Sequence, residues 1–191
     1  MPQIRILGLD ISSTTIGWCI LDIIDQKIVL VKYDYYKPNK NGHIISRLYE
    51  TKKFFNKLFK EYKPNQITIE EIIQYMSGAS SATTIITLTS FNRALGLLSY
   101  EYLKQLPTYY SVMSIRHGLK LSKELPAKED MPTLVEYYLD IKFNYLYNSK
   151  GKIKPETYDM SDACSVAINH ALKILAPNPQ PKIIRKTNAK K

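Results

Sequence analysis

The sequence predicts an α/β fold in which helices cover one mixed sheet. Three short β-branched runs with tight connections occupy the first 36 residues, which is typical of an antiparallel meander. The hydrophobic period then becomes that of an amphipathic helix, and two more strand patterns alternate with helical ones. A strand that follows a crossover helix usually pairs parallel inside the sheet. The expected order is therefore βββαβαβαα, with five strands in one sheet.

The expected meander contains strands over 4–10, 16–21 and 28–36. The first two form a hairpin, because the small residues 12–15 separate two β-branched runs. The first strand is apolar except for Asp10, near its end. A carboxylate at the end of a buried strand is costly unless it is solvated, paired or bound to a cation. On this stretch alone, Asp10 is either a turn-forming aspartate or a functional acid.

Helical and strand patterns alternate in the middle of the chain. An amphipathic helix is expected over 43–62, with Pro64 just beyond its end. A strand over 66–73 follows. The next helix, 82–106, has apolar positions on more than one face. Such a helix is either centrally buried or shared with a partner.

The last third of the chain is expected to hold one strand and two helices. The strand covers 109–115, and the polar stretch 116–129 is rich in basic residues. Asp130 is a candidate cap for a helix that runs to about 143, since Pro132 would lie in its first turn. The final helix is expected over 159–175.

Length and composition indicate one ordinary domain. A chain of 191 residues with 45% hydrophobic content can bury a substantial core. We expect this domain to cover 1–176, and 177–191 to be a basic, disordered tail. No apolar run reaches the roughly 18 residues of a membrane span, and no leader pattern precedes the first strand, so we expect a soluble, intracellular protein without membrane contact. Cys19 and Cys164 lack metal-ligand spacing and are expected to be buried.

The charge balance favours a polyanionic partner. The chain has 27 basic and 17 acidic residues, a net charge of +10. Five of the basic residues lie in the tail, so the body is basic as well. Nucleic acid fits such a charge, although solubility alone would also explain it.

Acidic residues in three separate elements form the candidate site. They are Asp10, Glu70 or Glu71 in the fourth strand, and Asp159 with Asp162 in the last helix. The helical pair projects from one side of the first turn, where acids also serve as caps. The strand glutamates could equally meet solvent at the strand end. Four carboxylates at one point repel unless divalent cations neutralise them, and oxygen-only ligands suit Mg²⁺ or Mn²⁺. Two such ions about 3.5–4 Å apart can support phosphodiester cleavage.

The segments that hold these acids resemble the motifs of RuvC-type Holliday junction resolvases, in the ribonuclease-H-like superfamily. ILGLDISSTTIGWCIL is similar to the first motif, Ile69-Glu70 to the second, and DMSDACSVAINHAL to the third. Their order agrees over 1–175. The resemblance implies a ribonuclease-H-like fold, with a three-stranded antiparallel meander plus two parallel strands, flanked by helices.

The resemblance also implies the site residues. It implies that four acids are both metal ligands and catalytic residues: Asp10, Glu70, Asp159 and Asp162. Glu70 is preferred to Glu71 because the family's glutamate directly follows an apolar strand residue. The implied cofactor is Mg²⁺, two ions per site, with Mn²⁺ as a substitute. Lys128 is the better counterpart of the family's basic residue beside the scissile phosphate, and Lys120 is the second choice.

The activity implied by the resemblance is paired nicking of four-way DNA junctions. The substrates could also include other branched DNA. It implies a homodimer around the helix 82–106. Brevity and richness in lysine and tyrosine suggest a phage-encoded member. Ser12 stands where the family usually has glycine, and Ile73 where many members place a base-stacking aromatic residue, a role that Tyr75 or Met76 could fill.

Two other functions are compatible with parts of the pattern. A non-catalytic branched-DNA-binding protein with a residual site would share the charge and the fold, but the intact set of four acids argues against it. In an actin- or hexokinase-like phosphotransferase, the first phosphate-binding loop also follows a strand that contains an aspartate. That fold needs a second glycine-rich loop, whereas the seven glycines here are not clustered.

Overall fold

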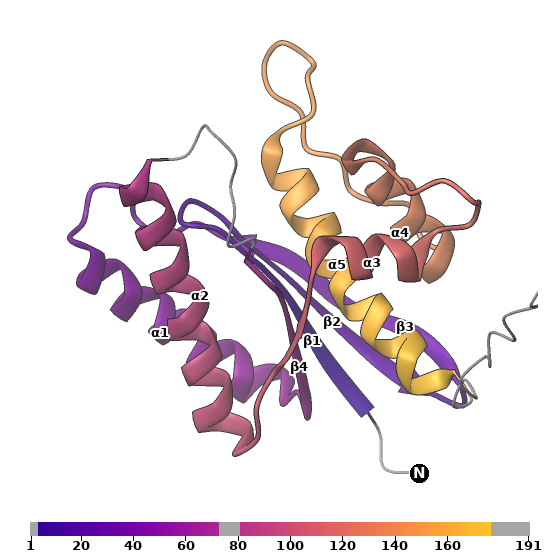
Figure 1. Ribbon diagram of the computed structural model, residues 1–191, viewed down its shortest axis with the longest axis horizontal. Coiled ribbons are helices and arrows are strands. Elements are labelled where there is room, and N and C mark those ends of the chain that lie inside the picture. Colours follow the sequence, from indigo (N-terminus) through magenta and orange to yellow (C-terminus); the bar gives the residue numbers. More distant parts are fainter. Residues whose placement is uncertain (1–3, 73–80, 177–191) are drawn as a thin grey trace, which may run out of the picture.

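A computed structural model describes residues 4–72 and 81–176. One five-stranded sheet, in the order β3-β2-β1-β4-β5, lies between two groups of helices (Figure 1). The strands are β1 (Ile4–Ile11), β2 (Ile16–Ile24), β3 (Lys27–Tyr36), β4 (Gln66–Glu70) and β5 (Thr108–Tyr110). The helices are α1 (Ile44–Tyr62), α2 (Ala82–Leu103), α3 (Val112–Leu119), the 3-10 turn η1 (Lys128–Asp130), α4 (Met131–Leu139) and α5 (Pro155–Leu175).

The strand directions confirm the predicted mixed sheet. β1 pairs with β2, and β2 with β3, in antiparallel fashion. β4 pairs parallel to β1, and β5 parallel to β4. Because β1 and β4 run in the same direction, their carboxyl ends meet at one edge of the sheet. This edge positions the candidate site.

Alternation along the strands creates a hydrophobic core on each face of the sheet. Leu7 and Leu9 of β1 pack with Phe55 of α1 and Phe91 of α2 on one face. The opposite core contains α3, α4 and α5, including buried residues of α5 such as Ala163, Cys164 and Ala167. Cys19 and Cys164 are both buried and free, as predicted. Within 4–72 and 81–176, no helix is long and apolar enough to cross a bilayer.

Two glycines let α5 lie directly on the sheet. A Cβ on Gly8 of β1 would collide with the backbone and side chains of α5 at Ala163 and Ala167. A Cβ on Gly17 of β2 would lie well inside van der Waals contact of the Asp159 carbonyl. The second turn of α5 therefore packs against the hairpin beside Asp10, which is the strand partner of Gly17.

The fifth predicted strand is wrong beyond Tyr110. β5 ends there, and α3 begins at Val112. Ser111 caps this helix, because its hydroxyl accepts a hydrogen bond of 3.2 Å from the Ser114 amide. The spacing of the buried Ile115 and Leu119 suits a helix that packs on α5 better than a strand.

The final helix begins at Pro155, four residues before the predicted start. Proline is favoured in the first turn because its missing N–H would have no helical partner there. Asp159 and Asp162 consequently lie beyond the first turn, and the interpretation of Asp159 as a helix cap is wrong. Its carboxylate is free for another role.

Other predicted elements extend too far at their C-terminal ends. α4 ends at Leu139 instead of 143, because Asp140 adopts the left-handed conformation. α2 ends at Leu103 instead of 106, again before a left-handed residue, Lys104. β4 ends at Glu70 instead of 73. The early end of β4 places Glu70 at the rim of the sheet.

Candidate active site

Two of the predicted acids lie at the carboxyl ends of neighbouring parallel strands. The register pairs Leu9 of β1 with Ile69 of β4. The residues that follow, Asp10 and Glu70, therefore reach the sheet edge side by side. Alternation places both side chains on the face that α5 covers, because Gly8, two residues before Asp10, contacts α5.

The other two acids come from α5. Asp159 and Asp162 are three residues apart on the helix, so both project from one side of it. The Asp159 backbone rests on Gly17, and an interaction with the side chain of the buried Thr15 acts against the rise in the pKa of the Asp159 carboxyl. The β1–β2 hairpin thus holds Asp159 from two points.

The turn of this hairpin depends on Ser12. Its hydroxyl accepts hydrogen bonds from the amides of Thr14 at 3.2 Å and Thr15 at 2.9 Å, and it donates to the Thr15 carbonyl at 2.7 Å. The family that the sequence resembles usually has glycine at this position. Serine replaces the conformational freedom of glycine with a network of hydrogen bonds that fixes Thr15.

Burial, together with repulsion between neighbouring acids, destabilises the charged forms of the four carboxylates. Burial is the largest cause for each, followed for Asp10 and Glu70 by repulsion from the other acids. The pKa of Asp10 is raised well above its usual value, and that of Glu70 to about 7. The pKa values of Asp159 and Asp162 rise to about 6. The cluster therefore concentrates negative charge in a place that water solvates poorly.

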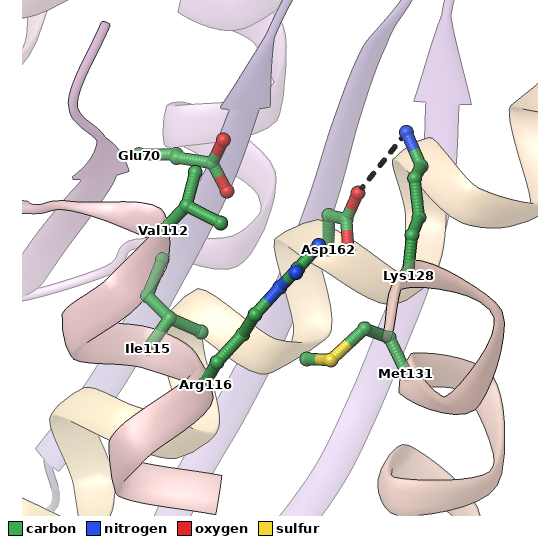
Figure 2. A pocket seen from close by; sticks show the side chains of 7 residues that line it. All are labelled: Glu70, Val112, Ile115, Arg116, Lys128, Met131 and Asp162. Carbon is green, nitrogen blue, oxygen red and sulfur yellow. Dashed lines mark ion pairs between the residues drawn. The ribbon is translucent and has the colours of Figure 1, made fainter. Parts of the chain in front are cut away.

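Two cations line a cavity of about 120 Å³ beside these acids (Figure 2). Lys128, the first residue of η1, places its Nζ 3.6 Å from Asp162 Oδ2. Arg116 reaches the same cavity from α3 (Figure 2). Both cations act against the rise in the pKa of Glu70 and of Asp162. A phosphate entering the cavity would meet both positive groups and the edge of the carboxylate cluster.

Arg116 is the cavity residue that sequence reasoning missed as a site residue. It was expected just after a strand, in a basic loop, where nothing distinguished it from its neighbours. The available signal was Ser111, a helix-capping residue, followed by apolar residues at helical spacing. A helix from that cap would have turned Arg116 toward α5.

Two alternatives considered from the sequence lie elsewhere. Glu71 forms an ion pair of 3.3 Å with Arg93 of α2. Lys120 lines a separate cavity together with Leu121 and Leu125. Ile73, Tyr75 and Met76, the residues considered for base stacking, lie outside the described residues.

The donor chemistry of the cluster fits a hard divalent cation. Its ligands would be carboxylate oxygens, and the burial and repulsion that raise their pKa values are what a bound cation offsets. Across 4–72 and 81–176, no three acids, histidines or cysteines form a group already arranged to hold an ion.

Comparisons with known proteins show which family this chain is similar to. The family profile described as crossover junction endodeoxyribonuclease RuvC matches residues 6–170. The chain is 24% identical over 164 residues to the RuvC crossover junction endodeoxyribonuclease of Prochlorococcus marinus strain MIT 9312, covering 86% of this chain and 94% of that protein.

Solved structures show the same fold. T. thermophilus RuvC in complex with a Holliday junction substrate superposes with a TM-score of 0.67 at 16% identity, covering 90% of this chain and 94% of that one. The yeast mitochondrial Holliday junction resolvase Ydc2 gives a TM-score of 0.60 at 18% identity, with 90% and 81% covered. The predicted ribonuclease-H-like fold is confirmed.

Proposed function

The chain belongs to the RuvC family of crossover junction endodeoxyribonucleases, and on this premise we propose that it resolves four-way DNA junctions by hydrolysis at the β1–β4–α5 edge. The observation that carries the proposal is the convergence of carboxylates from three distant segments beside two cations. The proposed ligand set is Asp10, Glu70, Asp159 and Asp162. A junction endonuclease needs such a set at an open edge, where a DNA strand can reach it.

The proposed cofactor is Mg²⁺, two ions per site, with Mn²⁺ as a substitute. When bound, such ions activate a water molecule and stabilise the leaving oxygen in phosphodiester cleavage. The chain's own contribution is to desolvate the carboxylates and to hold them on rigid elements. The Ser12 turn, Thr15 and Gly17 fix the position of Asp159 relative to Asp10.

The proposed role of Lys128 is to attract and orient the phosphate at the cavity. Burial alone would lower the pKa of Lys128. The neighbouring acids, of which Asp162 has the largest effect, outweigh burial and raise the pKa above its usual value. Lys128 therefore stays protonated over the working pH range. Arg116 faces the same space and supplies a second, fixed positive charge.

A homodimer through α2 would supply the two active sites that paired nicks require. Along the outer side of this helix, Ile86, Leu97 and Tyr100 are 66%, 61% and 47% exposed. Ile86 and Leu97 are 11 residues apart and Tyr100 follows after three, so all three lie on one stripe of the helix. A second copy of α2 packed on this stripe would cover it.

DNA binding rests on the positive charge of the domain and of the tail. We propose that 1–176 form the nuclease domain and that the basic residues of 177–191 add contacts to phosphates. Affinity for DNA should then fall steeply with salt. The protein would act inside the cell, where its DNA substrates lie.

Cleavage of synthetic substrates tests the proposal. The protein is incubated with a four-way junction, a three-way junction and a linear duplex, each with Mg²⁺, Mn²⁺ or EDTA. The proposal predicts symmetric nicks in the four-way junction with either ion and none in EDTA. Metal-independent binding to all junctions without any nick would instead show a non-catalytic binding protein.

A further inference from the structure

A short hairpin that precedes α5 has no part in the carboxylate site. It covers 146–154 and is called here the basic hairpin. Tyr147 and Ile153 form its antiparallel bridge. Figure 1 shows this segment projecting beyond the first turn of α5, at the end of the molecule where β1 and β4 finish.

Backbone hydrogen bonds and the Asn148 side chain hold the hairpin together. The Asn148 amide donates to the Lys152 carbonyl at 2.9 Å, and the Asn148 side chain accepts from the Lys150 and Lys152 amides at 2.9 and 3.0 Å. Its base is fixed to the domain, because the Leu146 amide donates to the hydroxyl of the buried Thr157 at 3.0 Å. The side chains at its tip are therefore presented on an ordered support.

All the charged residues of the basic hairpin are positive. Lys150, Lys152 and Lys154 are exposed, and no acidic residue occurs between 141 and 155. Among the described residues, none of the three lysines forms an ion pair. The next acid along the chain, Glu156, is paired with Lys37 of the β3–α1 loop. Three positive charges are thus available to an outside anion.

The hairpin stands at a fixed distance from the catalytic edge. Lys154 precedes α5, and Asp159 lies five residues further along the helix, about 7 Å by the helical rise of 1.5 Å per residue. Successive base pairs are about 3.4 Å apart along a duplex. Lys154 therefore lies within a few phosphates of a strand that occupies the carboxylate site, and Lys150 and Lys152 lie further out along the same hairpin.

We infer that the basic hairpin is a second DNA contact, whose lysines bind backbone phosphates of the duplex arm flanking the cleavage site. Its contribution is to binding and not to chemistry, since it is separated from the reacting groups by the first turn of α5. This inference rests on the proposed junction-cleaving function, because it needs a strand in the site to define where the arm lies.

The test removes the three charges and keeps the fold. Lys150, Lys152 and Lys154 are changed together to glutamine, and binding to a synthetic four-way junction in EDTA is measured from 50 to 300 mM salt. Each lost phosphate contact lowers the slope of log K against log salt by about 0.9. We expect the slope to fall by about 2–3 and affinity at 100 mM salt to fall about 10- to 100-fold. The cleavage rate at saturating junction should stay unchanged.

The matched control changes three exposed lysines at the far end of the sheet. Lys57, Lys60 and Lys63 lie at the end of α1, before β4 begins. Their change to glutamine removes the same charge and should alter the slope by less than half as much. An equal fall in both variants would show a general charge effect and overturn the inference.

The outcomes separate this inference from the proposed function. A native protein that neither binds nor cuts junctions contradicts the proposed function and removes the basis of the inference. A native protein that cuts junctions while the hairpin variant keeps the full salt slope contradicts the inference alone. A hairpin variant with a lowered cleavage rate at saturation would also overturn it, because the hairpin would then act on the chemical step.

Discussion

Neutralising Glu70 should stabilise the metal-free protein even as it destroys the site. In the folded chain burial and then repulsion raise the pKa of Glu70 from 4.5 to about 7, so the folded state binds this proton more tightly than the unfolded state. Above pH 7 the ionised form therefore lowers the free energy of unfolding. This cost fades as the pH falls through 7, and it is absent below the unfolded value of about 4.5.

The size of the effect follows from the shift. At about 1.4 kcal/mol for each tenfold change in proton affinity, the cost at pH 8 is about 3 kcal/mol. Glutamine removes the charge but still has an amide to desolvate, so we expect Glu70→Gln to raise the free energy of unfolding by about 1–2 kcal/mol. In a chain of this length that corresponds to about 2–8 °C in Tm.

Urea denaturation in EDTA at pH 8 and pH 5.5 measures this difference. The gain should be present at pH 8 and much smaller at pH 5.5, where the native carboxyl already holds its proton. Glu71→Gln is the matched control, because Glu71 pairs with Arg93 outside the cluster, and it should show no such gain. The reasoning is refuted if Glu70→Gln is no more stable than the native chain at pH 8, or if its gain is equal at both pH values.

Four further outcomes follow from the site and its supports. Millimolar Mg²⁺ should raise Tm more at pH 8 than at pH 5.5, because protons compete for the same carboxylates; an equal rise in differential scanning fluorimetry would contradict this. Gly17→Ala should slow cleavage at least about 10-fold and cost about 1–3 kcal/mol of stability in urea denaturation by pushing α5 from the sheet. Gly42→Ala should change neither, because its Cβ would make only a van der Waals contact of 3.4 Å with the flexible Arg47 side chain. Thr15→Val should lower kcat with little change in KM, whereas Thr15→Ser, which keeps the hydroxyl, should retain the native kcat. An equal fall of kcat in both variants would contradict a role for the Thr15 hydroxyl beside Asp159. Leu97→Glu should shift a dimer toward monomer in analytical ultracentrifugation, and an unchanged mass would exclude α2 as the interface.

The sheet could be predicted because its signals are local. Turn residues bound each strand of the meander, and the switch from period two to period 3.6 marks α1. The parallel placement of β4 then follows from the handedness and length of the crossover. Asp10 and Glu70 meet because each stands near the end of its strand, so the site edge is a consequence of strand direction.

The parts that were missed depend on packing between distant segments. Three of the residues 112–115 are apolar and two are β-branched, which suits a strand locally. Burial of Ile115 and Leu119 against α5 instead selects a helix. Arg116 enters the site only through that helix. The start of α5 at Pro155 was obscured by the polar residues around it, and the support that Gly17 gives Asp159 cannot be read from either segment alone.

The most direct test is single-turnover cleavage of a four-way junction by Asp10→Asn and Asp162→Asn variants in Mg²⁺, with junction binding measured in parallel. Both acids are proposed ligands from different elements, β1 and α5, so removal of either should cost several kcal/mol of transition-state stabilisation, at least about 100-fold in rate. Binding should be retained, since neither change removes a positive charge. Cleavage at the native rate by either variant would contradict the assignment of this edge as the active site.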